Sequence, residues 1–142
     1  MALVLFVLST AAVAQTKPAL PVDDLGGEWH GRWTSPSGYL FTTVLTLTVA
    51  PGGAADGRFV WTLKKSPLPG EQRKVGLSAT EFVTGTVNEA AGTVTLAGGR
   101  KDDPDDVIFT DRYRLVLGAT GRTLAGVSGN LGDWDGLLFL QR

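Results

Sequence analysis

The chain has 142 residues, contains no cysteine and carries a formal net charge of −1. Disulfides and thiolate metal sites are therefore excluded. A charge so close to zero argues against nucleic acid or an anionic membrane as a partner, because both attract a basic surface. The length suits one domain that is held together by packing alone.

The N-terminal segment has the features of an export signal. Residues 2–8 form an unbroken apolar run, and Ala12 and Ala14 have the small-residue spacing that signal peptidase accepts. We therefore predict that residues 1–14 are a signal peptide, cleaved before Gln15, and that the protein is exported and is periplasmic or secreted. The run is far shorter than the ~20 residues of a spanning helix, so we expect no membrane span after signal cleavage.

The rest of the chain has the pattern of a β protein. Residues 15–26 contain two prolines without periodicity and are predicted to be a flexible arm. Residues 27–142 show short apolar–polar alternations separated by Gly, Pro, Asn and Asp, which predicts a single β domain. The predicted strands are residues 28–33, 39–50, 58–65, 80–87, 93–98, 108–117, 123–130 and 134–142.

The connections between these strands determine the predicted fold class. Most are short, so strands adjacent in sequence should pair as antiparallel hairpins. An open sheet would leave two bare edges, and pairing the last strand with the first removes both. The prediction is an all-β, eight-stranded antiparallel up-and-down (meander) barrel, whose interior is packed or holds one small ligand. A two-sheet sandwich is the alternative.

Both ends of this β domain carry residues that suggest a known architecture. Gly27-Glu28-Trp29 opens the first strand, and Arg142 ends the last. This arrangement resembles the calycin group of barrels, which includes lipocalins, fatty-acid-binding proteins and avidins. The resemblance implies structural barrel closure by Trp29 and Arg142, with the indole buried and the guanidinium stacked on it. The alternative is that Arg142 points into solvent.

Candidate ligand-binding residues lie toward strand ends. Alternation places Asp111 with Phe109 and Tyr113 on the inward face of the sixth strand, near a barrel mouth. A buried carboxylate must be paired or must orient a ligand. With Trp61 and Tyr39, these residues predict a site for a small apolar or amphipathic molecule. The alternatives are that Asp111 is half exposed and structural, and that the aromatic residues form the core.

The predicted function is therefore that of a non-enzymatic exported binding module, whose partner is an unknown small molecule or protein. The long, Pro-rich loop of residues 66–74 supports the alternative of a protein-interaction or inhibitor-type barrel that acts through its loops and has a packed core.

The sequence predicts no catalytic residues and no cofactor. His30 is the only histidine, and alternation turns it toward solvent with Glu28. The absence of cysteine excludes a Cys–His pair. The conceivable acids or bases are Glu28, Glu81 and Asp111, and nothing in the sequence shows that any two of them converge.

No metal site is predicted either. Residues 101–106 hold four aspartates, and carboxylate oxygens suit Ca²⁺. However, they lack the alternating Asp-x-Asp-x-Asp-Gly spacing, and Pro104 stiffens the segment. We predict a solvated acidic loop rather than a calcium site.

Overall fold

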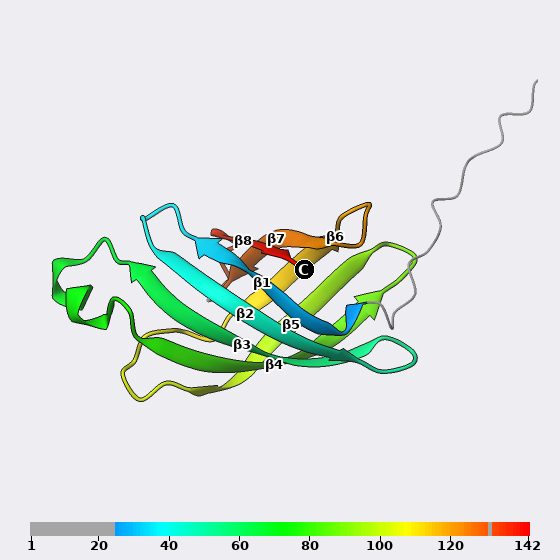
Figure 1. Cartoon of the computed structure of the whole chain (residues 1–142), viewed down its shortest axis with the longest axis horizontal. Helices are drawn as coiled ribbons and strands as arrows, with labels where there is room; N and C mark the ends of the chain where they lie inside the picture. The colour runs from blue at the N-terminus through cyan, green and yellow to red at the C-terminus, as the bar shows by residue number, and fades with distance from the viewer. Residues whose placement is uncertain (1–24, 131) are drawn as a thin grey trace, which may run out of the picture.

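The computed structural model describes residues 25–130 and 132–142, and the predicted signal peptide lies outside this part. The described chain forms eight strands and a short 3₁₀ helix, η2 (Pro69–Lys74) (Figure 1). The strands are β1 (Gly27–Thr34), β2 (Leu40–Val49), β3 (Ala54–Lys65), β4 (Ser78–Asn88), β5 (Thr93–Asp102), β6 (Arg112–Leu117), β7 (Thr123–Gly129) and β8 (Gly136–Gln141). No helix in the described ranges is long and apolar enough to cross a membrane.

The strands form a closed barrel in simple sequence order. Each strand pairs antiparallel with the next, and β8 pairs with β1, so that Arg32 lies opposite Phe139. The predicted eight-stranded meander barrel is confirmed, and the sandwich alternative is wrong. The architecture is that of a small, closed, antiparallel β-barrel.

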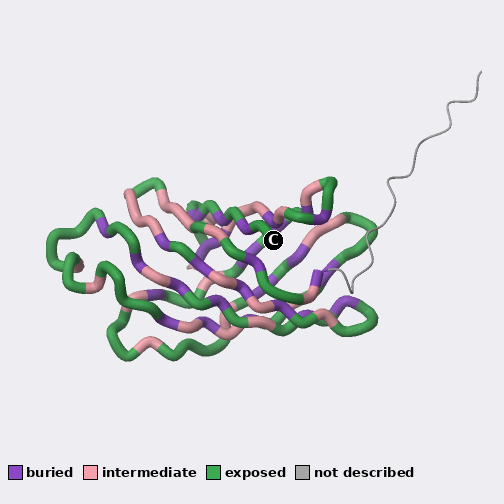
Figure 2. Tube along the Cα trace, in the orientation of Figure 1, coloured by how far each residue is buried: buried purple, intermediate pink, exposed green. Residues whose placement is uncertain are grey.

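Side-chain alternation separates the core from the outer surface. In β3, Phe59, Trp61 and Leu63 are buried, whereas Arg58 and Lys64 are exposed. The alternation of buried and exposed positions is complete in β6 and β8, and Figure 2 shows buried positions interspersed with more exposed ones along the chain. Because successive side chains of a strand point to opposite faces, the observed register places the alternating apolar residues of neighbouring strands on the inner face of the barrel.

The barrel has two different ends. One, which we call the mouth, is formed by the β1–β2, β3–β4, β5–β6 and β7–β8 connections; η2 belongs to it. The opposite end, which we call the sealed end, is formed by the β2–β3, β4–β5 and β6–β7 turns and holds the start of β1 and the end of β8 (Figure 1).

Trp29 and Arg142 meet at the sealed end. Trp29 is fully buried, and its Nε1–H donates to the carbonyl oxygen of Leu25 at 3.0 Å. The guanidinium carbon of Arg142 lies 4.4 Å from the centroid of the Trp29 ring, and its Nε donates to Gly121. Leu25, in the predicted arm, is buried against the same core. The guanidinium of Arg142 therefore lies over the buried indole of Trp29.

Three strand boundaries differ from the sequence prediction by four residues, and the other differences are of one or two residues. β3 begins at Ala54 rather than at residue 58, because Gly52 and Gly53 adopt positive φ and turn the chain within four residues. β5 continues to Asp102, into the predicted acidic loop. β6 begins at Arg112 rather than at residue 108, because the residues before it are held in a loop by Asp103, as described below.

Candidate functional site

A cavity of about 260 Å³ opens at the mouth. All four predicted ligand-binding residues, Trp61, Tyr113, Asp111 and Tyr39, lie in its wall. The other lining residues are Trp33, Ser35, Ser37, Phe41, Glu71, Lys74, Asp106, Val107, Ile108, Phe109, Asn130 and Asp135. The structure thus brings together residues from every mouth connection.

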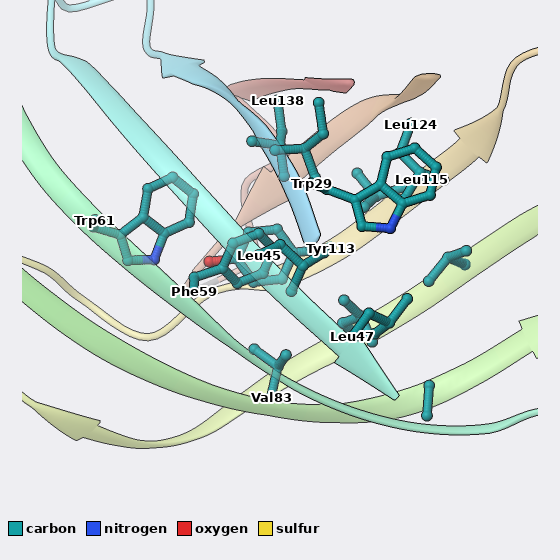
Figure 3. Close-up of a cluster of buried hydrophobic side chains, with 14 of the residues drawn as sticks. Trp29, Leu45, Leu47, Phe59, Trp61, Val83, Tyr113, Leu115, Leu124 and Leu138 are labelled. Carbon is teal, nitrogen blue, oxygen red and sulfur yellow. The ribbon is translucent and has the colours of Figure 1, made fainter. Parts of the chain in front are cut away.

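The floor of this cavity is a chain of aromatic rings that continues into the core. Phe41 meets Trp61 edge to face, with centroids 6.2 Å apart. Trp61 stacks on Phe59 at 4.8 Å, and Phe59 lies 4.8 Å from Tyr113. Figure 3 shows Trp61, Phe59 and Tyr113 in sequence, with Trp29 farther along the lumen. The lumen is therefore packed below a pocket at one end.

A buried carboxylate, Glu81 of β4, lies behind the aromatic floor. It is fully buried, and each of its oxygens has a donor. Oε2 accepts from Trp61 Nε1 at 3.0 Å and from the Tyr113 hydroxyl at 2.5 Å, and Oε1 accepts from the Asp111 backbone N–H at 2.8 Å. A Cβ at Gly98 would overlap Oε1, so the glycine permits this approach.

Burial dominates the electrostatics of this group. It raises the pKa of Glu81 from 4.5 to about 7, and the three donors oppose this change without cancelling it. Burial and the nearby Glu81 charge also raise the pKa of Tyr113 well above its ordinary value. Near neutral pH, the Glu81 carboxyl group is therefore partly protonated, directly behind the rings of Trp61 and Tyr113 in the pocket wall.

Asp111 differs from the sequence prediction in its position relative to the sixth strand. It precedes β6 instead of lying within it, and it is half-buried. Its Oδ2 accepts from Ser128 Oγ at 2.7 Å, and Ser128 in turn accepts from Trp33 Nε1. Phe109, expected to face inward with it, is 77 % exposed, which corrects that prediction.

The η2 segment is attached to the pocket by Glu71. Glu71 Oε2 accepts from the Tyr39 hydroxyl at 2.8 Å and from Ser66 Oγ at 2.7 Å. These hydrogen bonds lower the pKa of Glu71, which keeps its carboxylate ionised. Lys74, at the end of η2, donates to the backbone oxygen of Asp106. The loop of residues 66–74 therefore forms part of the cavity wall.

Asp103 organises the acidic loop from within. Its carboxylate is buried and accepts from the N–H groups of Val107 and Ile108 at 2.7 and 3.0 Å and from Lys101 Nζ at 2.9 Å. Burial would raise the pKa of Asp103, but these donors together hold it below its ordinary value. Within residues 25–130 and 132–142, no group of three or more histidines, cysteines or carboxylates is arranged to hold a metal ion.

The remaining titratable candidates lie away from the pocket. His30 Nε2 is 2.7 Å from Glu28 Oε1, and both side chains are exposed. Neither residue lines the cavity. Glu81 was considered in the sequence analysis only as a conceivable acid or base, although its alternation with Val83 and Val87, both buried, could have placed it on the inner face.

Comparison with solved structures identifies other barrels of this shape. The chain is similar to a redesigned β-barrel, mFAP1, bound to DFHBI (15% identity, TM-score 0.62, 85% of this chain and 97% of that chain). A second redesigned barrel, mFAP0, also bound to DFHBI, matches at 14% identity and a TM-score of 0.60 over 84% and 99% of the two chains. A de novo designed fluorescence-activating β-barrel matches at 11% identity and a TM-score of 0.54 over 82% and 92%.

Comparisons with protein families and with curated proteins found no match. At 15% identity or less, the structural neighbours show a shared fold and no more. The chain therefore shares the β-barrel fold of these proteins.

Proposed function

We propose that this protein is a non-enzymatic, exported binding module that holds a small apolar or amphipathic molecule in the mouth cavity. The observation that carries the proposal is a concave, aromatic-walled pocket at one end of an otherwise packed barrel. Small-molecule sites combine apolar walls with a few convergent polar groups, and this cavity has both. Its volume of about 260 Å³ suits a small ligand.

The state of the buried carboxylate supports binding rather than catalysis. A general acid or base must reach the substrate proton directly or through one water. Glu81 lies beneath the floor with both oxygens engaged by three donors, and Glu28 is on the outer surface. Of the three conceivable acids or bases, Glu28, Glu81 and Asp111, only Asp111 lines the cavity.

The structural neighbours add a fold-level argument. The redesigned barrels mFAP1 and mFAP0 were solved bound to DFHBI, so barrels of this shape accept a small molecule. The analogy concerns architecture, and the pocket residues of this chain supply the rest of the support.

The proposal can be tested with a neutral fluorescent probe, N-phenyl-1-naphthylamine, and with two variants that add the same bulk at opposite ends. Ser37→Trp places an indole at the cavity, and Ala119→Trp places one in the β6–β7 turn of the sealed end. We expect the mouth variant to weaken probe binding at least about tenfold and the sealed-end variant to leave it unchanged. Equal affinities for both variants, or no binding by the unmodified protein, would contradict the proposal.

Native mass spectrometry of protein purified from its own host is the complementary measurement. A reproducible mass excess that disappears on denaturation supports a bound small molecule. Repeated absence of any such mass, together with failure of the probe, counts against a ligand-binding function.

A protein partner that docks on the loops is the second candidate. Apolar side chains are exposed around the mouth, among them Leu68 at 50 % and Phe109 at 77 %. Loops on a rigid scaffold commonly carry recognition. We expect Leu68→Ser to reduce recovery of a partner in a pull-down if this candidate is right, with Val116→Ser on the outer wall as the matched control. Unchanged recovery removes this loop from consideration.

A further inference from the structure

The charged groups of the mouth cavity fall into a compensated set and an uncompensated set. Among the described residues, Lys74 is the one cationic side chain in the cavity wall, and it is already engaged. Its Nζ lies 3.9 Å from carboxylate oxygens of both Glu71 and Asp106 and donates to the Asp106 carbonyl. Asp106 has a second cation, Lys101, at 3.4 Å. Lys101 also lies 2.9 Å from Asp103, so Glu71, Asp106 and Asp103 each have a lysine partner on this side of the mouth.

Asp111 and Asp135 form the uncompensated set. Asp111 accepts a hydrogen bond from the neutral hydroxyl of Ser128. In the part of the chain that the structure describes, no lysine, arginine or histidine nitrogen lies within ion-pair distance of either carboxylate. Burial raises the pKa of Asp111, and the negative charge of Asp135 raises it further. Both carboxylates therefore line the β6–β8 side of the cavity without a cationic partner among the described residues.

The aromatic rings of the cavity wall have no free hydrogen-bond donor. Every polar hydrogen on these rings is directed to a protein acceptor: Trp33 Nε1–H to Ser128, Trp61 Nε1–H and Tyr113 O–H to Glu81, and Tyr39 O–H to Glu71. These rings therefore offer an occupant aromatic carbon surface without an N–H or O–H donor, and aromatic faces attract cations. The wall thus combines aromatic surface with carboxylate oxygens.

We propose that the mouth cavity selects a small amine in its protonated form, carried on a flat apolar group. Its ammonium would lie toward Asp111 and Asp135, where it would donate hydrogen bonds and supply the cationic partner that both carboxylates lack. Its apolar part would lie against Trp61 and Tyr39. This inference rests on the proposed function and names the ligand class of the same site.

Calorimetric titration with three indoles tests the ligand class. Tryptamine is cationic, 3-ethylindole is neutral, and indole-3-propionate is anionic, while the ring system is the same. We expect tryptamine to bind at least about tenfold more tightly than 3-ethylindole, and indole-3-propionate to bind most weakly. Added salt should weaken tryptamine binding and leave 3-ethylindole binding unchanged, because only the first depends on charge attraction.

Two neighbouring aspartates provide a matched pair of variants. Asp135 lines the cavity, whereas Asp133, two residues earlier in the same connection and also exposed, does not. Asp135→Asn should reduce the preference for tryptamine over 3-ethylindole several-fold, and Asp133→Asn should leave it unchanged. Circular dichroism and thermal melting verify that both variants keep the fold.

The outcomes separate this inference from the function on which it rests. If 3-ethylindole or indole-3-propionate binds as tightly as tryptamine, or if the neutral naphthylamine probe binds and tryptamine does not, the amine inference is overturned and the binding function stands. If neither the indoles nor the naphthylamine probe binds, the proposed function fails as well.

Discussion

At the sealed end, a tryptophan indole fills the lumen, and its single polar hydrogen is used by a nearby backbone carbonyl, that of Leu25. At the mouth, Trp61 donates instead to a buried carboxylate, Glu81, that Tyr113 also shares. The same residue type thus closes one end with apolar packing and builds a polar network at the other. Apolar packing stabilises without a desolvation penalty, whereas a buried charge must be offset by its donors. We infer that the packing at the sealed end stabilises the fold, whereas the buried carboxylate behind the cavity lowers the stability of the mouth.

The largest expected effect is at the sealed end. Trp29→Ala should lower the free energy of unfolding by about 3–5 kcal/mol, because it leaves a cavity in the core and removes the contact with Arg142. Trp134→Ala is the control, since Trp134 is half-buried on the outer wall against Arg112 and Arg114. Urea unfolding measures both variants. Equal losses would show that the sealed end has no special role in stability.

The second expected effect is a pH dependence of the free energy of unfolding that is caused by Glu81. The pKa of Glu81 is about 7 in the folded barrel and 4.5 ordinarily, so between these values the folded state holds a proton that the unfolded chain releases. The free energy of unfolding should therefore fall as pH rises from about 4.5 to about 7, by about 3 kcal/mol.

Glu81→Gln should remove most of this slope, because an amide does not titrate. Glu89→Gln, in the exposed β4–β5 turn, should retain it. Urea unfolding at pH 5 and pH 8 gives the comparison. A glutamine variant with the full slope would assign the dependence to another group.

A third test returns to the sealed end. Removing Gln141 and Arg142 should cost about 1–3 kcal/mol, through the lost cation–π contact and the carbonyls of Gly121 and Arg122 left without donors. Thermal melting of the truncated and full chains checks this prediction. Identical melting temperatures would mean that the contact adds nothing to closure.

The smallest effect is expected at the rim of the mouth. Tyr39→Phe removes the hydrogen bond to Glu71 and should cost only about 0.5–1 kcal/mol, because the site is partly exposed. Its clearer signature should be faster hydrogen exchange of the η2 amides, with exchange in β7 unchanged. Protected η2 amides in the variant would show that Ser66 and Lys74 suffice to hold the segment.

The eight strands were predictable because alternation and turn residues are local signals. The contact of Trp29 with Arg142 followed from barrel closure. One edge of β8 pairs with β7, so in a closed meander its other edge must pair with β1. The beginning of β6 was not predictable. Ile108 and Phe109 alternate like a strand, but the buried Asp103 carboxylate captures the N–H of Ile108, a competition that periodicity does not report.

The candidate site was predictable in part, because the order of the strands determines which strand ends meet. Tyr39, Trp61, Asp111 and Tyr113 lie near strand ends that antiparallel order collects at one mouth, so their common position followed from topology. The Glu81 network depends on three donors from separate strands and loops, and side-chain directions of this kind are set by packing rather than by spacing.

The pairing of β1 with β8 has a consequence for how the barrel forms. Seven of the eight pairings join strands adjacent in sequence, whereas the last joins residues such as Arg32 and Phe139, with nearly the whole described chain between them. Contacts so distant in sequence carry the largest loop-closure entropy and form late. Until then β1 and β8 are unpaired edges, and β8 carries the exposed side chains of Leu137 and Phe139. The interval before closure is therefore when edge-to-edge association between nascent chains competes most strongly with folding.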